Sequence, residues 1–222
     1  MGDSVRYSGC MVAPVQTDTP EVLTELLRPD IRFQGAEPEQ RVVYSDISWA
    51  RYLAFDKELG DDRPGPRLYY LDGQLEIMST SDEHEKIKKW ISGFLEIYFD
   101  EIGIEITPRG QATMRLELKK AGAEPDESWC LEEEKKFPDL VLEIALSSGG
   151  LNKLQTYQRF RVPEVWIWRK GKLEIHALNR SGIYERTEKS RLLPKLDVLL
   201  LEKCVAIRSW QQARRTFRTG VG

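Results

Sequence analysis

The spacing of hydrophobic residues along this chain changes between a period of two and a period of about 3.6, which predicts alternating strands and helices. Apolar positions alternate with polar ones over residues 67–71 and again over residues 74–78. Between these segments stands Asp72-Gly73, a pair that is typical of the tight turn in a β-hairpin. The sequence therefore predicts a hairpin over residues 67–78.

A long helix is predicted directly after this hairpin. It is expected to begin near Ser81, where Thr80 and Glu83 have the spacing of a capping box, and Gly103 lies just past its end. One face of the helix is apolar and carries Ile87, Ile91, Phe94, Leu95 and Tyr98. This spacing is typical of a helix with one buried face.

The other segments complete a fold of mixed class. Further strands are predicted over 104–107, 112–118, 127–131, 139–146, 165–169 and 173–178, and further helices from Ser45, over 151–161 and over 206–217. This order predicts an α/β (or α+β) fold in which helices flank a central mixed β-sheet. Residues 1–40, which contain four prolines, are expected to be an irregular arm, and residues 41–222 a single domain.

The charge of the chain excludes a uniformly basic nucleic-acid-binding protein. The 222 residues are 41% hydrophobic and 31% charged, with a net charge of -3, so any contact with nucleic acid must come from local basic patches. Three basic runs are candidates: Lys86, Lys88 and Lys89, then Arg159 and Arg161, then Arg214, Arg215 and Arg218. Taken alone, each run is more simply interpreted as an ordinary solvated face.

The cysteines and the N-terminal segment favour a cytoplasmic location. Cys10, Cys130 and Cys204 are odd in number, far apart and without a CxxC pair, which is typical of reduced, buried thiols. The N-terminus has no basic-then-apolar signal pattern, and no apolar run approaches the roughly 18 residues of a membrane span. We therefore expect no association with a membrane.

Two acidic residues are predicted to meet across a hairpin. Residues 132–136 are five consecutive charged residues, and a hairpin centred between Glu134 and Lys135 places Asp126 opposite Glu143. Opposed residues of an antiparallel pair project from the same face, with Cβ atoms about 5 Å apart. Two carboxylates this close repel each other, and a divalent cation such as Mg²⁺ removes the conflict.

Three side chains near this pair are further candidates, each with an ordinary alternative. Glu143 lies in an otherwise apolar strand, so it serves a site or pairs with Arg or Lys. Lys153 lies in the first turn of the next helix, where a cation opposes the helix dipole; the alternative is a surface lysine. His84 lies on the apolar face of the long helix, as a site residue or as a satisfied core or cap histidine. Glu85 is a weaker candidate, and His176 is interpreted as structural.

Six segments, in this order, resemble the Uma-two family of restriction endonucleases within the PD-(D/E)XK nuclease superfamily. They are Asp72-Gly73-Gln74-Leu75-Glu76-Ile77-Met78, Glu83-His84-Glu85, Glu124-Pro125-Asp126-Glu127, Pro138-Asp139-Leu140-Val141-Leu142-Glu143-Ile144, Leu151-Asn152-Lys153-Leu154 and Val162-Pro163-Glu164-Val165-Trp166. The resemblance extends from about Tyr44 to Phe217, which is most of the chain. It implies a restriction-endonuclease-like fold and a nuclease activity.

The resemblance also implies roles for individual residues. Asp126 and Glu143 are expected to bind Mg²⁺ or Mn²⁺, Lys153 to complete the catalytic set, and His84 to match the family's helix histidine. The superfamily pattern has a lysine two residues after the glutamate, where this chain has Ala145. The resemblance therefore assigns that role to Lys153.

Together these features predict an endonuclease that uses a divalent metal to hydrolyse DNA phosphodiester bonds. DNA is the expected partner, and a homodimer is one option because double-strand cutters are often dimers by symmetry. Two other functions stay open. One is a catalytically inactive nuclease fold that binds nucleic acid or regulates, and the other is an interaction protein that assembles through an apolar edge near Trp166 and Trp168.

Overall fold

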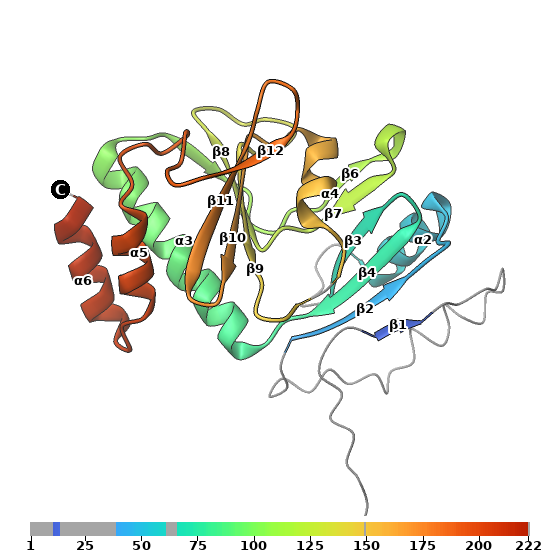
Figure 1. Ribbon diagram of the computed structural model, residues 1–222, viewed down its shortest axis with the longest axis horizontal. Coiled ribbons are helices and arrows are strands. Elements are labelled where there is room, and N and C mark those ends of the chain that lie inside the picture. The colour runs from blue at the N-terminus through green and yellow to red at the C-terminus, as the bar shows by residue number, and fades with distance from the viewer. Residues whose placement is uncertain (1–10, 14–38, 61–65, 149, 222) are drawn as a thin grey trace, which may run out of the picture.

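The computed structural model, which describes residues 11–13, 39–60, 66–148 and 150–221, places the strands of these ranges in two six-stranded sheets (Figure 1). The first sheet has the order β1-β2-β4-β3-β7-β6, with β1 Met11–Ala13, β2 Gln40–Tyr44, β4 Gln74–Ser79, β3 Arg67–Leu71, β7 Ala121–Ala123 and β6 Met114–Leu116. The second has the order β12-β11-β10-β9-β8-β5, with β12 Tyr184–Thr187, β11 Lys172–Leu178, β10 Glu164–Arg169, β9 Leu140–Ile144, β8 Glu127–Leu131 and β5 Ile106–Pro108. The helices are α2 Trp49–Leu59, α3 Asp82–Ile102, α4 Lys153–Phe160, α5 Val198–Val205 and α6 Trp210–Val221, and a 3₁₀ turn spans Glu117–Lys119.

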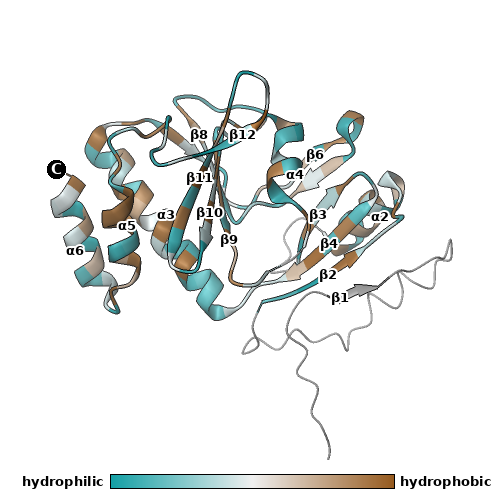
Figure 2. Cartoon of the chain, viewed as in Figure 1, coloured by the Kyte–Doolittle hydropathy of each residue, from teal (hydrophilic) through white to brown (hydrophobic). Residues whose placement is uncertain are grey.

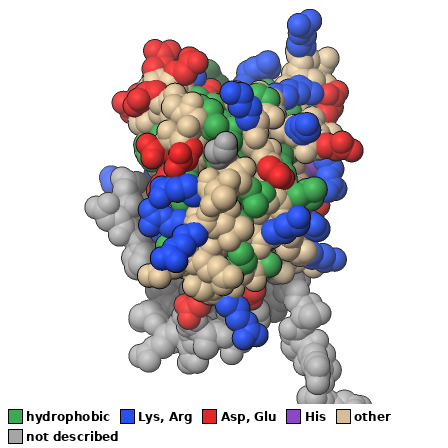
Figure 3. Space-filling view, turned by 90° about the vertical axis from the view of Figure 1, so that its left-hand side faces the viewer, with side chains coloured by type: hydrophobic (Ala, Val, Ile, Leu, Met, Phe, Trp, Pro, Cys, Tyr) green, Lys and Arg blue, Asp and Glu red, His purple; other side chains and the backbone are tan. Residues whose placement is uncertain are grey.

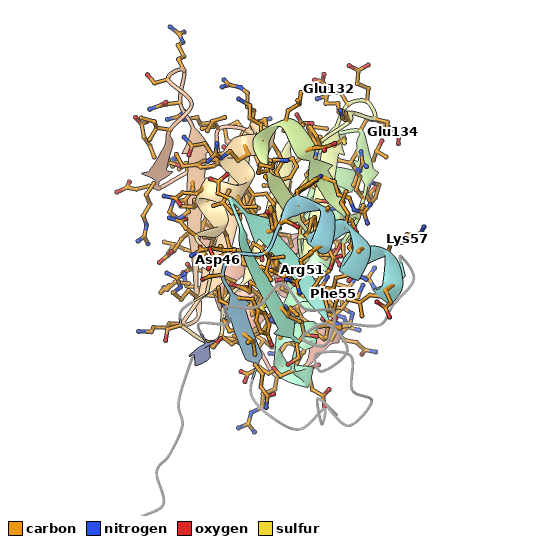
Figure 4. All side chains as sticks on the ribbon, turned by 90° about the vertical axis from the view of Figure 1, so that its right-hand side faces the viewer. Asp46, Arg51, Phe55, Lys57, Glu132 and Glu134 are labelled. Atoms are coloured by element: carbon orange, nitrogen blue, oxygen red, sulfur yellow. The ribbon has the colours of Figure 1, made fainter. Side chains whose placement is uncertain are left out.

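Helices cover the outer faces of both sheets, and α4 lies between the sheets (Figure 1). α3, α5 and α6 pack on one another and on the second sheet, around a core that includes Phe94 and Trp166. α2 packs on the first sheet through Tyr52 and Phe55, while Lys57 points away from the protein (Figure 4). The predicted class, helices flanking a mixed sheet, is confirmed, with the strands divided between two sheets.

Alternation along β9 separates two environments. Leu140, Leu142 and Ile144 face the α3–α5–α6 layer, and hydrophobic residues continue from β9 to α5 (Figure 2). Val141 belongs instead to the core between the second sheet, α4 and the first sheet. Because side chains alternate along a strand, Glu143 points into this same inner layer. The inner layer is therefore where polar groups of both sheets meet.

The predicted hairpin and long helix are confirmed, but both predicted cap residues are wrong. α3 is capped by Ser81 rather than Thr80, because the Ser81 hydroxyl accepts a hydrogen bond of 3.2 Å from the first turn. α2 is capped by Ser48 rather than Ser45, because the chain first turns at Asp46, where φ is 59°. A serine caps only where the backbone leaves the helical region, and spacing alone did not identify that point.

Several elements were not predicted. They are the short strands β1, β2, β7 and β12 and the helix α5, and α6 begins at Trp210 rather than near residue 206. β1 lies inside the expected irregular arm and pairs in parallel with β2. The rest of that arm, up to residue 38, lies outside the described residues.

The burial of two tryptophans removes one alternative function. Trp166 and Trp168 are buried in β10, which lies between β9 and β11, so they cannot form an exposed apolar edge. Cys130 and Cys204 are free and buried as predicted, and Cys10 lies outside the described residues. Among the described helices, none has the length and apolar character needed to cross a membrane.

Candidate active site

Polar side chains of the first sheet face the second sheet because of strand alternation. Tyr69 of β3 is paired with Glu76 of β4, so both project from the same face, and Tyr69 lies in the inner core. Arg67 lies two residues before Tyr69 and faces the same way. The β3–β4 hairpin therefore places three polar side chains in the inner layer: the carboxylate of Glu76, the guanidinium of Arg67 and the phenol of Tyr69.

The second sheet contributes the two predicted carboxylates. β8 and β9 pair antiparallel with Glu127 opposite Leu142, and this register continued by one residue places Asp126 opposite Glu143. The backbone N–H of Ile144 donates a 2.7 Å hydrogen bond to Oδ2 of Asp126, which ties the two strands together at this point. The register agrees with the hairpin alignment expected from the spacing.

Asp126 is held as an ionised carboxylate by its neighbours. Its Oδ1 lies 2.9 Å from Nε2 of His84 and 3.0 Å from Nε of Arg67. Burial by itself would raise the pKa of Asp126, but the charges of His84 and Arg67 and the Ile144 N–H outweigh burial and lower the pKa to about 2.

Glu143 has the opposite character. Burial raises the pKa of Glu143 to about 7, the charge of Asp126 adds to the rise, and Lys153 opposes it. The hydroxyl of Tyr69 lies 3.1 and 3.0 Å from the two carboxyl oxygens and 2.7 Å from the carbonyl oxygen of Glu124, so its one proton is shared among these acceptors, and the hydroxyl of Tyr157 donates to Oε1. Two neighbouring carboxyls are therefore driven apart in pKa, an arrangement that clusters at functional sites.

The free energy of unfolding is expected to fall as the pH rises from about 4.5 to about 7. The unfolded chain loses the Glu143 proton near the ordinary pKa of 4.5, whereas the folded protein keeps it until about 7, so the unfolded state binds fewer protons in this range. The contribution of Glu143 is complete below pH 4.5 and is lost by pH 7, about 3 kcal/mol for a shift of this size.

Urea unfolding of the wild type and of Glu143→Gln, in EDTA at about pH 5 and about pH 8, measures this loss. The variant should lose less stability than the wild type, and Glu134→Gln, which alters an exposed glutamate on the β8–β9 turn, should behave as the wild type does (Figure 4). The same pH dependence in all three proteins would contradict the prediction.

Lys153 is turned into the inner layer. It is the first residue of α4, its side chain is only 13% exposed, and its Nζ lies 3.2 Å from Oε1 of Glu76 and over the ring of Tyr69. In the described part of the chain this ammonium makes an ion contact but no well-formed hydrogen bond. Burial lowers the pKa of Lys153, and Glu76 and Glu143 oppose the change. The surface-lysine alternative is therefore wrong.

His84 is fully buried between two carboxylates. Its Nε2 faces Asp126, and its Nδ1 lies 3.1 Å from Oε2 of Glu39. Glu39 also accepts a 2.6 Å hydrogen bond from the Ser147 hydroxyl and pairs with Arg41. The chain of contacts from Glu39 through His84 fixes the carboxylate of Asp126 in place.

Several site residues were not singled out from the sequence. They are Glu39, Arg41, Arg67, Tyr69, Glu76 and Tyr157. The sequence could have identified one of them, Glu76, because this residue, like Glu143, is the only acid within an apolar strand. Tyr157 follows Lys153 by one helical turn, which puts both on one face of α4.

An open pocket of about 690 Å³ reaches this inner layer. Glu143 and Lys153 line it together with Arg41, and Glu174 and His176 line its opposite side. His176, which was interpreted as structural, lines this pocket, and Oε2 of Glu174 lies 3.8 Å from its Nε2. The pocket arises because β9, β10 and β11 present their inner faces side by side.

The two carboxylates could hold a divalent cation. An ionised carboxylate offers about four lone pairs. Asp126 is in hydrogen-bond contact with His84 and with the Ile144 N–H and makes an ion contact with Arg67, and Glu143 is approached by two hydroxyls, so lone pairs remain on both carboxylates for a cation. Over the described ranges no group of three or more His, Cys, Asp or Glu residues is placed to hold a metal. Two carboxylates, with water and substrate completing the shell, suit Mg²⁺ or Mn²⁺.

The basic runs have different surroundings. Lys88 is buried and lies 2.5 Å from Glu85, so it is not part of a solvated face. Arg159 pairs with Asp72. On the α6 side of the molecule, lysine and arginine side chains are spread among acidic, neutral and hydrophobic ones (Figure 3). The lysine and arginine side chains visible on that side do not form one continuous basic surface (Figure 3).

Comparison with known proteins identifies the family. The model of the Uma2 family, which is described as "Putative restriction endonuclease", matches residues 49–212. No curated protein matches the chain. The match includes Asp126, Glu143, Lys153 and His84, whereas Glu39 and Arg41 precede it. Since it covers nearly three quarters of the 222 residues, this chain belongs to the Uma2 family.

Proposed function

We propose that this protein is a metal-dependent endonuclease that hydrolyses DNA phosphodiester bonds in the pocket above Glu143. One observation carries the proposal: Asp126 and Glu143 stand at opposed positions on paired strands, and the buried Lys153 lines the same pocket as Glu143. The family match supports the nuclease class.

Asp126 and Glu143 are the residues that would hold Mg²⁺ or Mn²⁺. When bound, such a cation supplies Lewis-acid polarisation of the phosphoryl oxygen and eases deprotonation of water. Arg67 and His84 keep Asp126 charged and fixed, so one ligand position is formed in advance. The hydroxyls of Tyr69 and Tyr157 orient Glu143, which must lose its proton to act as a ligand.

Lys153 supplies positive charge where the phosphate becomes more negative. Its ammonium lies in a largely buried position, where an electrostatic contact is stronger than in water. Its contact with Glu76 holds it at the pocket floor, and the missing hydrogen bond leaves it free to bind a phosphate oxygen or the attacking water.

A catalytically inactive nuclease fold that binds nucleic acid or regulates is the second candidate. One feature favours it: three protein groups already engage the Asp126 carboxylate, and two of them are basic side chains that neutralise its charge. A carboxylate whose negative charge is already offset by neighbouring basic side chains attracts a metal cation less strongly.

Supercoiled plasmid DNA is expected to be nicked or linearised by the wild-type protein in Mg²⁺ or Mn²⁺ and to stay intact in EDTA. EDTA removes the divalent cation, and without this Lewis acid the two carboxylates cannot polarise the phosphoryl oxygen. Gel electrophoresis of the plasmid measures the conversion. Intact plasmid under all conditions, with retained DNA binding, would favour the inactive module, and equal cleavage in EDTA would refute the metal dependence.

A further inference from the structure

The face of the second sheet that carries Glu143 continues as a polar surface across β10 and β11. Ile167 of β10 is paired with Glu143 on one side and with Glu174 of β11 on the other, so the three residues form one row. In the adjacent row, Val165 is paired with His176. Paired residues, and residues two apart, share a face, so Glu174 and His176 project on the same side as Glu143.

We define the outer wall of the pocket as Arg169, Lys170, Glu174 and His176. Glu174 and His176 lie on β11, about two strand spacings or roughly 10 Å from Glu143, and Arg169 ends the intervening strand β10. Arg169 and Lys170 stand at the tip of the β10–β11 hairpin and are exposed. A polynucleotide whose reacting phosphate lies at Glu143 therefore passes over or near this wall, whereas a single phosphate group does not reach it.

The charged groups of the outer wall are held loosely. Glu174 lies 3.8 Å from Arg169, 3.8 Å from His176 and 3.5 Å from Arg186 of β12. These distances exceed the usual hydrogen-bond length of about 2.7–3.2 Å, so the cations are near one carboxylate but not bound to it. With Arg169, Lys170 and Arg186 against Glu174, positive charge is in excess, which suits a phosphate.

His176 adds an unsatisfied donor or acceptor. Its Nε2 is buried and makes no hydrogen bond within the described part of the chain, and its side chain is only 14% exposed. Leaving such a group unpaired is costly, and a small rotation of the partly exposed ring would let a ligand in the pocket satisfy it. Burial lowers the pKa of His176, so at neutral pH it is an uncharged imidazole, which can donate one hydrogen bond.

We propose that the outer wall is a second phosphate subsite, in which Arg169, Lys170 and His176 bind a backbone phosphate neighbouring the one at Glu143. The inference rests on the proposed nuclease function and adds to it the residues that bind the DNA backbone beside the reacting phosphate. Glu174 lies near Arg169 and Arg186 and opposes phosphate binding by its own charge.

Fluorescence anisotropy of a labelled DNA duplex, in EDTA and at about 50 to about 200 mM salt, tests the subsite. Removal of one phosphate contact by Arg169→Ala is expected to raise the Kd about 5- to 10-fold and to reduce the salt slope by about 0.9. Glu174→Gln is expected to lower the Kd because it removes a negative charge facing the phosphate. Arg208→Ala alters an exposed arginine between α5 and α6 and should change neither quantity.

Steady-state cleavage with Mg²⁺ separates binding from chemistry. Arg169→Ala is expected to raise the KM and to leave kcat unchanged, as expected when contacts to the ground state and the transition state are lost equally. A Kd and KM equal to those of Arg208→Ala would overturn the subsite while cleavage by the wild type upheld the nuclease. A wild type that neither binds nor cleaves DNA would overturn both.

Discussion

Cleavage of plasmid DNA by Glu143→Ala is expected to be at least about 10³-fold slower than cleavage by the wild type. Glu143 is one of two carboxylates proposed to hold the metal, and Lewis-acid stabilisation contributes several kcal/mol, at about 1.4 kcal/mol for each tenfold change in rate. The substitution also removes the carboxyl that accepts from the Tyr157 hydroxyl, while the Tyr69 hydroxyl keeps the Glu124 carbonyl oxygen as an acceptor. The initial rate of conversion of supercoiled plasmid in Mg²⁺ measures the loss.

Two variants separate loss of chemistry from loss of folding. Glu143→Gln keeps the shape and the acceptor oxygen, so it should fold and still fail to cleave. Glu134→Ala removes an exposed glutamate of the same hairpin and should cleave at the wild-type rate (Figure 4). Cleavage by both Glu143 variants at the wild-type rate would place the active site elsewhere.

Lys153→Met is expected to reduce the cleavage rate by about 10²- to 10³-fold, the loss typical of removing one charge-stabilising group from an enclosed site. Methionine fills a similar volume without the ammonium. Glu76 keeps the 2.5 Å hydrogen bond from the N–H of Leu151 and lies 4.0 Å from Arg41, so it retains partners. Single-turnover cleavage in Mg²⁺ gives the rate of the chemical step, and urea unfolding gives the stability.

The matched control is Lys57→Met, which removes an exposed lysine on the outward side of α2 (Figure 4). It should leave both the rate and the DNA affinity unchanged. If Lys153→Met cleaves as fast as this control, Lys153 serves packing or folding and not the reaction. If it loses DNA affinity in proportion to the rate, Lys153 binds substrate without favouring the transition state.

Local patterns were sufficient for the elements whose contacts are close in sequence. The hairpin β3–β4, the helix α3 and the strand β8 follow from period and turn chemistry, and the charged turn after β8 set the alignment of Asp126 with Glu143. The short strands β2, β7 and β12 were not predicted, because three to five residues are too few to show a clear hydrophobic period.

The partners of the two carboxylates were decided by tertiary structure. Arg67 and Tyr69 precede Asp126 and Glu143 by more than fifty residues, and their contacts exist only because the inner faces of the two sheets meet around α4. Strand alternation predicts the face of its own sheet from which each side chain projects. It does not predict which helix or which other sheet packs against that face.

The sequence by itself thus determined which acids share a strand pair and which helix carries Lys153, because both depend on spacing along a continuous segment. The tertiary structure alone decided that Arg67 and His84 lower the pKa of Asp126, that burial raises the pKa of Glu143, and that His176 shares the pocket. The physical reason is that pKa and pocket shape depend on burial and on charges brought in from distant segments, which no local period encodes.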